Sequence, residues 1–292
     1  MFYYDTNGVL RGEIPVLYYR SHRLLFDDDG LMWFSASTHH MVGMNRLGKL
    51  EKILDLGSNY ILHHDYAMDD DGNIVLLATE LSRSDNAVQD QVIKLDTTTG
   101  SVTRLLDFGE MLADYKASTT HAGTDESDST AKNRWDWLHC NTIQLLDDGS
   151  ALFSARETST IIKIDDLEGV PTLDYMIGEP SVWNGTKEVS TFLDKDGDFP
   201  DTGGQHSITY VADDSLPDGQ YYLYIVRQQL RHRTDPPRFR LIGHRRHLHG
   251  ILLRHRALAI PQVSGGRERR HLHGGLLVRR AVFPVCLLRA GA

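Results

Sequence analysis

Five side chains of the sequence are of types that bind and transfer an anionic group: His64, His139, Asn141, Arg156 and His206. An uncharged imidazole is a nitrogen nucleophile, and a second imidazole can act as a base because its pKa lies near neutrality. A guanidinium can donate two parallel hydrogen bonds to one tetrahedral oxyanion. If the fold brings these groups together, they could transfer part of such an anion without a metal ion or a nucleotide.

The spacing of these residues predicts that they lie at matched positions on neighbouring strands. His64 precedes Gly72 by eight residues, and Asn141 precedes Gly149 by the same number. Because side chains alternate along a strand, His139 and Asn141 should point the same way. A lone histidine on a strand is more often structural than catalytic, so the inference depends on this repetition. If each residue lies at the start of an innermost strand, the imidazoles converge on a common axis.

Residues 135–165 show which elements would carry the site. Three short apolar runs, at 142–146, 151–154 and 161–164, are separated by turn signals. The Asp-Asp-Gly sequence at 147–149 supplies the positive φ that a tight hairpin requires. The runs are too short for helices and are rich in Ile, Leu and Phe, so we predict antiparallel strands.

The same pattern recurs along the chain. A polar residue, an apolar run, an acidic-glycine turn and a second apolar run occur at 22–37, 64–79 and 141–156, and a fourth copy runs from His206 to near Val226. Each full copy continues with two further strands, and four antiparallel strands are typical of one β-propeller blade. We predict an all-β fold, a partial β-propeller of about three and a half blades, with a sandwich of hairpins as the alternative. The further strands are expected at 41–45 and 50–56, at 92–96 and 102–108, and at 161–165 and 172–177.

Two long segments interrupt the repeat. Residues 110–134 begin as a short predicted helix and continue as a polar stretch, and residues 179–204 form a second long loop. Long ordered loops on such a fold usually cover one mouth of the central channel and carry function. We expect the same of these two segments.

Charge and composition divide the chain after Val226. Residues 1–226 contain 16 Lys and Arg against 38 Asp and Glu, whereas residues 227–292 contain 15 Arg, one Asp and one Glu. Seven of the 15 His also lie in the second part. We predict one domain over 1–226 and interpret 227–292 as an aberrant tail, disordered or translated from a shifted reading frame. A nucleic-acid-binding arm is disfavoured because aromatic residues are almost absent from it.

Neither cysteines nor apolar runs place the chain in a compartment. Cys140 and Cys286 do not form a disulfide framework, and no apolar run reaches the roughly 20 residues of a membrane helix. The first residues lack the basic and apolar regions of a signal peptide. We therefore expect no membrane partner.

Four motifs connect the chain to a known family. They are H-H-D at 63–65, D-W-L-H-C-N at 136–141, S-A-R at 154–156 and G-Q-H at 204–206. Together they resemble bacterial arylsulfate sulfotransferases, the enzymes that do not use a nucleotide sulfate donor. The resemblance covers about residues 18–225, and the block from 136 to 156 is its most specific part.

The resemblance implies a fold, a reaction and a set of roles. It implies a six-bladed β-propeller that moves a sulfuryl group from an aryl sulfate ester to a phenol, with ping-pong kinetics and no cofactor. His206 would be the residue sulfated, and His64, His139, Asn141 and Arg156 would bind and polarise the sulfate. The partners implied are small molecules, not nucleic acid, and the location implied is periplasmic or extracellular.

Three other interpretations stay open. A ring of histidines could hold zinc or another transition ion, but Arg156 beside a cation would be unfavourable and no compact carboxylate cluster accompanies the ring, so we expect no metal. A calcium site at 194–198 lacks the EF-hand spacing. A non-catalytic binding propeller is the main alternative, since this fold is widely used for binding.

The chain departs from the family in extent. Three and a half blades cannot close a six-bladed ring, and an open propeller exposes unpaired strand edges. The family's N-terminal accessory domain and its active-site hydroxyl residues in later blades have no counterpart in this sequence. We therefore expect this chain to fold poorly or aggregate, and to have little transferase activity.

Overall fold

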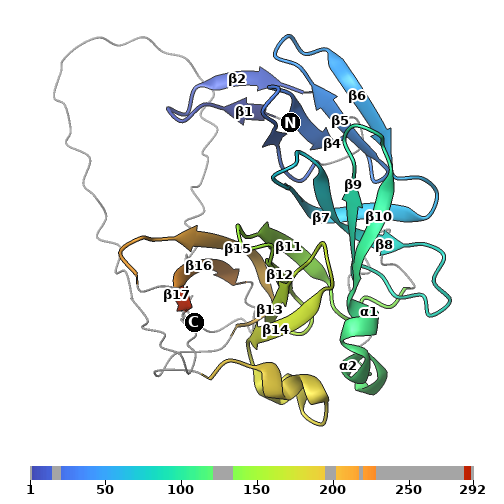
Figure 1. Ribbon diagram of the computed structural model, residues 1–292, viewed down its shortest axis with the longest axis vertical. Coiled ribbons are helices and arrows are strands. Elements are labelled where there is room, and N and C mark those ends of the chain that lie inside the picture. Colours follow the sequence, from blue (N-terminus) through green and yellow to red (C-terminus); the bar gives the residue numbers. More distant parts are fainter. Residues whose placement is uncertain are drawn as a thin grey trace, which may run out of the picture.

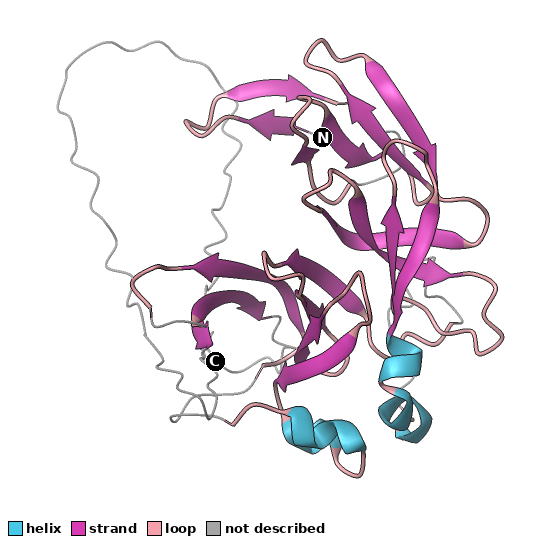
Figure 2. Ribbon diagram, viewed as in Figure 1, coloured by secondary structure: helices cyan, strands magenta, loops and turns pink. Residues whose placement is uncertain are grey.

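Strands dominate the computed structural model, and short helices occur in two connections between them (Figure 1, Figure 2). Four antiparallel sheets of three or four strands follow one another along the chain, after a hairpin of β1 (Phe2–Tyr4) and β2 (Leu10–Glu13). The residues that the structure describes are 2–14, 21–120, 134–194, 202–216, 220–227 and 286–290.

Each of the first three sheets is a meander of four consecutive strands, and we call these sheets the first, second and third blades. The prediction of an all-β, partial β-propeller is confirmed, and strand bounds agree with the expected ones within one or two residues. The first blade contains β3 (Leu25–Phe26), β4 (Met32–Ser35), β5 (His40–Met44) and β6 (Leu50–Asp55). The second contains β7 (Tyr60–Met68), β8 (Ile74–Glu80), β9 (Gln91–Leu95) and β10 (Val102–Asp107). The third contains β11 (Cys140–Leu145), β12 (Ala151–Ala155), β13 (Thr160–Asp165) and β14 (Thr172–Ile177).

The fourth blade has three strands in the described part of the chain. Strands β15 (Gln205–Ala212) and β16 (Tyr221–Arg227) form the hairpin that the sequence predicts from His206 to Val226, and β17 (Cys286–Ala290) pairs with β16. Residues 228–285, 291 and 292 lie outside the described residues. The interpretation of 227–292 as an aberrant tail therefore stays a prediction.

The acidic-glycine turns close the hairpins in the predicted way. Gly72, between β7 and β8, has a φ of 79°, and its N–H donates to the carbonyl of Asp69 at 3.1 Å. The carboxylate of Asp69 accepts from the N–H of Asn73 at 2.7 Å. Glycine adopts this left-handed conformation without a steric penalty. The carboxylate of Asp69 accepts from a backbone N–H that would otherwise lack a partner in the tight turn.

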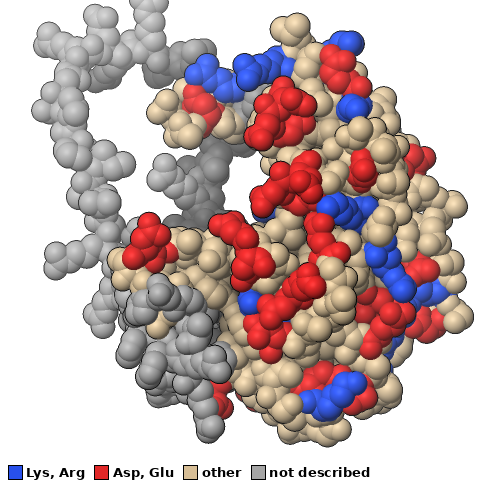
Figure 3. Space-filling model, in the orientation of Figure 1, with Lys and Arg blue, Asp and Glu red and all other residues tan. Residues whose placement is uncertain are grey.

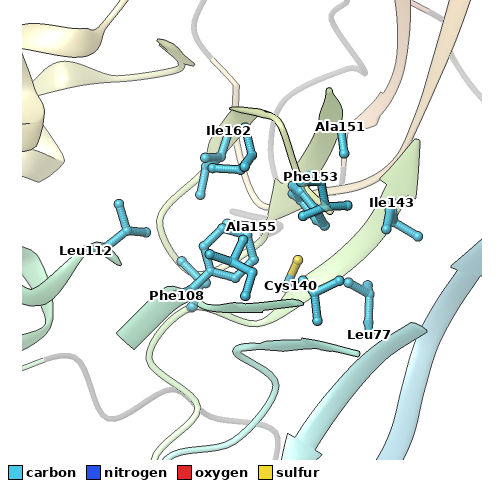
Figure 4. Packing of buried hydrophobic residues seen from close by; sticks show 14 of the residues in the cluster. Leu77, Phe108, Leu112, Cys140, Ile143, Ala151, Phe153, Ala155 and Ile162 are labelled. Carbon is cyan, nitrogen blue, oxygen red and sulfur yellow. The ribbon is translucent and has the colours of Figure 1, made fainter. Parts of the chain in front are cut away.

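The largest apolar cluster joins the second and third blades (Figure 4). Leu77 of β8 and Phe153 of β12 both belong to it and are fully buried. The rings of Phe108 and Phe153 meet edge to face, with centroids 5.1 Å apart. Burial of each such side chain contributes about 1.5–3 kcal/mol. This cluster therefore fixes one blade against the next.

The first strands of the second, third and fourth blades lie next to one another. Strand β11 contacts β7 on one side and β15 on the other. This is the arrangement expected of innermost strands around a propeller axis. Side chains near the start of these three strands are consequently brought to one place.

The first connection contains two short helices. Helix α1 (Phe108–Met111) begins where Asp107 accepts hydrogen bonds from the N–H groups of Gly109 at 2.7 Å and Glu110 at 3.3 Å. Helix α2 (Ala113–Ser118) follows directly. The helix predicted from residue 110 is therefore observed, but it starts two residues earlier because an aspartate side chain caps it.

The second connection packs against the first. It contains two 3₁₀ helices, η1 (Pro180–Trp183) and η2 (Lys187–Thr191), where the sequence predicts a loop. The rings of Tyr115 and Trp183 are 4.1 Å apart, which places both connections at the same edge of the blades (Figure 2). Residues 121–133 and 195–201 lie outside the described residues, so cover of a channel mouth stays a prediction.

Candidate functional site

Three predicted site residues from three blades meet. His64 lies in β7, His139 immediately precedes β11, and His206 lies in β15. The Nε2 atoms of His64 and His139 are 3.1 Å apart. The ring centroid of His206 lies 5.5 Å from that of His64 and 5.9 Å from that of His139. Strands that neighbour one another around the axis thus present three imidazoles to one space.

The guanidinium of Arg156 lies beside this group. The backbone N–H of Arg156 donates to the carbonyl of His139 at 3.1 Å, because β12 ends where β11 begins. Its Nε and Nη2 atoms contact one carboxylate oxygen of Glu157 at 2.7 and 2.5 Å. The side chain of Arg156 is held by Glu157 and is 17% exposed.

Asn141 is used by the fold itself. Its Nδ2 donates to the backbone carbonyl of Gln205 at 2.9 Å, and its Oδ1 accepts from the hydroxyl of Thr142 at 3.2 Å. The sequence predicts a sulfate-binding role for Asn141. In the structure its amide holds the backbone of the residue that precedes His206, and the sulfate-binding role stays a prediction.

Bulges shape all three inner strands at this site. Residues 63–65 of β7 lie opposite the single residue Leu77, and the register also shifts at Asn141 in β11 and at Ser207 in β15. His64, His139 and Ser207 have positive φ values of 49°, 52° and 67°. Such conformations cost about 1–3 kcal/mol each in residues other than glycine, and bulges re-aim side chains next to functional sites.

These bulges change the register that the sequence predicts. Strict alternation would place His64 at the position equivalent to Asn141. The two extra residues of the β7 bulge instead bring His64 against His139, as the 3.1 Å contact shows. The residues do converge, but by a local distortion and not by regular pleating.

Two neighbours of the histidines were given no role from the sequence. A carboxylate oxygen of Asp136 is hydrogen-bonded to Nδ1 of His139, and Asp136 is fully buried. The Nδ1 atoms of His63 and His64 are 3.1 Å apart. The signal for the first contact was present in D-W-L-H, where Asp precedes His by three residues.

Burial keeps two of the imidazoles uncharged. It lowers the pKa of His206 to about 4, with the neighbouring His139 and the cation of Arg156 acting in the same direction. Burial and the surrounding imidazoles also hold the pKa of His64 far below its ordinary value. Both rings are therefore neutral at pH 7. A neutral ring has the lone pair that a nucleophile needs.

The three imidazoles are close enough to share one ligand. One nitrogen from each of His64, His139 and His206 lies within 4.8 Å of the others, a spacing that a tetrahedral oxyanion or a transition ion could fit. The sequence favours the oxyanion, and the absence of a metal remains a prediction. Of the calcium alternative at 194–198, only Asp194 is among the described residues.

A hollow lies at the hairpin-turn end of the second and third blades, away from the histidine cluster. It has a volume of about 460 Å³, and Asp70, Asp147 and Asp166 help to line it. Lys94 is paired there with Asp69 and Glu168. Acidic side chains are also prominent on the face seen in Figure 3. A carboxylate-lined hollow disfavours an anionic ligand, so the histidine cluster is the better oxyanion site.

Comparisons with known proteins agree with the motifs. A family model described as arylsulfotransferase (ASST) matches residues 1–231. No curated protein matches the chain. A solved streptogramin B lyase is 12% identical, with a TM-score of 0.40, over 77% of this chain and 72% of that one. A Lactobacillus plantarum protein is 16% identical, with a TM-score of 0.42, over 78% of this chain and 57% of that one. No helix in the described part of the chain is long and apolar enough to cross a membrane.

Proposed function

The chain belongs to the arylsulfotransferase family, and from that premise we propose that it moves a sulfuryl group from an aryl sulfate ester to a phenol through a sulfohistidine at His206. The observation that carries the proposal is the meeting of His64, His139 and His206 beside Arg156. This arrangement offers an uncharged nucleophile and several donors around one tetrahedral anion.

The first half-reaction loads His206. Its ring nitrogen attacks sulfur while the bond from sulfur to the aryl oxygen breaks, and the phenolate leaves with the electron pair. The transition state is loose and in line, with negative charge on the three remaining oxygens, as in phosphoryl transfer. Arg156 donates hydrogen bonds to those oxygens.

The second half-reaction unloads His206. The acceptor phenol attacks sulfur, its proton passes to an imidazole, and the bond from nitrogen to sulfur breaks so that His206 regains its lone pair. His139 is the candidate base, because its Nε2 lies 3.1 Å from Nε2 of His64 and its ring centroid lies 5.9 Å from that of His206. No nucleotide or metal takes part in either step.

The test traps the intermediate. The full chain is incubated with 4-nitrophenyl sulfate, digested under alkaline conditions and analysed by mass spectrometry. We expect one sulfuryl adduct on the peptide that contains His206, and none in His206→Gln. His40→Gln is the matched control, because His40 lies in the first blade, where its Nε2 faces Asp55 at 3.6 Å. This half-reaction requires no turnover, which we expect to be low for this chain.

A non-catalytic binding propeller gives a different result. It would bind the aryl sulfate, measured by calorimetry, without releasing 4-nitrophenol or forming an adduct. Binding without an adduct would therefore replace the proposed transferase with a binding module. We also propose that the protein acts outside the cytoplasm, as the family resemblance implies, and fractionation of cells that express the native gene tests this.

A further inference from the structure

Four side chains form a continuous line through the site: Asp136, His139, His64 and His63. The carboxylate of Asp136 meets Nδ1 of His139, Nε2 of His139 meets Nε2 of His64 at 3.1 Å, and Nδ1 of His64 meets Nδ1 of His63 at 3.1 Å. We propose that Asp136 is a positioning residue that fixes the tautomer of His139 and thereby aims its basic nitrogen at His64 and His206. The assignment of a catalytic purpose to this line rests on the proposed function.

The proton positions follow from what each group can donate. An ionised carboxylate only accepts, so Nδ1 of His139 carries the proton in its contact with Asp136. In the neutral ring, Nε2 of His139 then has a lone pair and accepts from Nε2–H of His64. The Nδ1 atom of His64 accepts in turn from His63. One proton lies in each contact, and no two lone pairs face each other.

The setting of Asp136 supports a dedicated role. The residue is fully buried, and one carboxylate oxygen makes no hydrogen bond within the described residues. The other oxygen bonds His139 and lies 3.9 Å from Nη2 of Arg156. Burial of a carboxylate is costly unless it is paired, and this one is paired only on the side that faces the site.

The backbone is also arranged for this contact. His139 holds a φ of 52°, a conformation that costs about 1–3 kcal/mol in a residue other than glycine. With Asp136 three residues earlier, this turn lets the ring fold back onto the carboxylate while Nε2 faces the other imidazoles. Either nitrogen of a free histidine could carry the proton, whereas a carboxylate on Nδ1 selects one form.

The proposal is tested with Asp136→Asn. The asparagine side chain has nearly the same shape, but its NH₂ group can donate to Nδ1 of His139. The ring proton then moves to Nε2, and Nε2 can no longer accept a proton from the acceptor phenol. We expect the rate at which an acceptor phenol unloads the sulfohistidine to fall by about 100-fold or more, with donor affinity nearly unchanged. Asp147→Asn, an exposed change in the β11–β12 turn, is the matched control and should leave the rate unchanged.

The tautomer itself is read by NMR of ¹⁵N-histidine-labelled full chain, with the signal of His139 assigned from His139→Gln. We expect the Nδ1–H form in the parent protein and in Asp136→Glu, which keeps a carboxylate, and the Nε2–H form in Asp136→Asn. An Nε2–H form in the parent protein, or unchanged tautomer and rate in Asp136→Asn, overturns the proposal. If no sulfohistidine forms in the parent protein, the proposed function fails but the NMR result still decides the tautomer.

Discussion

Asn141 donates from its Nδ2 atom to the backbone carbonyl of Gln205 at 2.9 Å, and this bond links the inner strand of the third blade to the residue before His206. Gln205 is fully buried and its own amide donates to the carbonyls of Ala155 at 3.3 Å and Thr160 at 3.0 Å. Strand β15 is therefore attached to the third blade at the point where it carries the proposed nucleophile.

Replacing Asn141 should disturb stability more than donor binding. In Asn141→Ala the buried carbonyl of Gln205 loses the nearer of its two side-chain donors, and we expect a loss of about 1 kcal/mol in the free energy of unfolding, measured by urea denaturation. His206 should also be loaded more slowly, because its strand is less well fixed. Ser154→Ala is the control, since the hydroxyl of Ser154 reaches the same carbonyl only at 3.4 Å. A variant of unchanged stability with weakened donor binding would support the sulfate-binding role that the sequence predicts for Asn141.

Replacing Arg156 should affect the reaction more than the fold. In Arg156→Lys the planar guanidinium becomes a single ammonium, which cannot keep Glu157 and also give two parallel bonds to a sulfate. We expect the rate of sulfohistidine formation to fall by about 100- to 1,000-fold, the usual effect of removing an oxyanion donor. Single-turnover release of 4-nitrophenol measures the rate. An unchanged rate would show that Arg156 serves only to hold Glu157.

Strands and turns could be predicted because their signals are local. The strand expected at 172–177 is observed at the same residues as β14 (Thr172–Ile177), and Gly72 and Gly149 have the positive φ that the turn motifs require. That the imidazoles meet could also be predicted, because the repeat places the strands that carry them around one axis. Apolar alternation and turn chemistry were sufficient for this much of the structure.

The contacts inside the site could not be predicted in the same way. The bulge at residues 63–65 inserts two residues that no alternation pattern reveals, and it decides that His64 meets His139. The bond from Asp136 to His139 depends on a left-handed residue, which is uncommon outside glycine. Both features are local strains held by tertiary packing, and sequence periodicity carries no information about them.

Removal of metal ions should leave the reaction intact. The line from Asp136 through His139 to His64 already uses the ring nitrogens that a metal would need. We expect the rate of sulfohistidine formation to be the same before and after dialysis against EDTA. Loss of the adduct after dialysis, with recovery on addition of Zn²⁺, would instead favour the metal site that the sequence analysis disfavoured.

Acid should weaken the fold through the same histidines that we assign to chemistry. The pKa of His206 is about 4 in the folded protein and 6.5 in its ordinary state, because burial disfavours the charged ring. Between these values the unfolded chain binds more protons, so the free energy of unfolding falls as the pH is lowered from about 7 to 4. The lowered pKa of His64 acts in the same direction.

Urea denaturation at pH 7 and pH 5 measures this dependence. In His206→Gln one of the groups that titrate differently in the two states is gone, so the decrease in stability between the two pH values should be smaller than in the parent protein. His40→Gln is the control, because His40 is 43% exposed and lies outside the cluster. Equal decreases in the parent protein and in His206→Gln would mean that His206 is not held neutral by the fold, and the neutral nucleophile would lose its support.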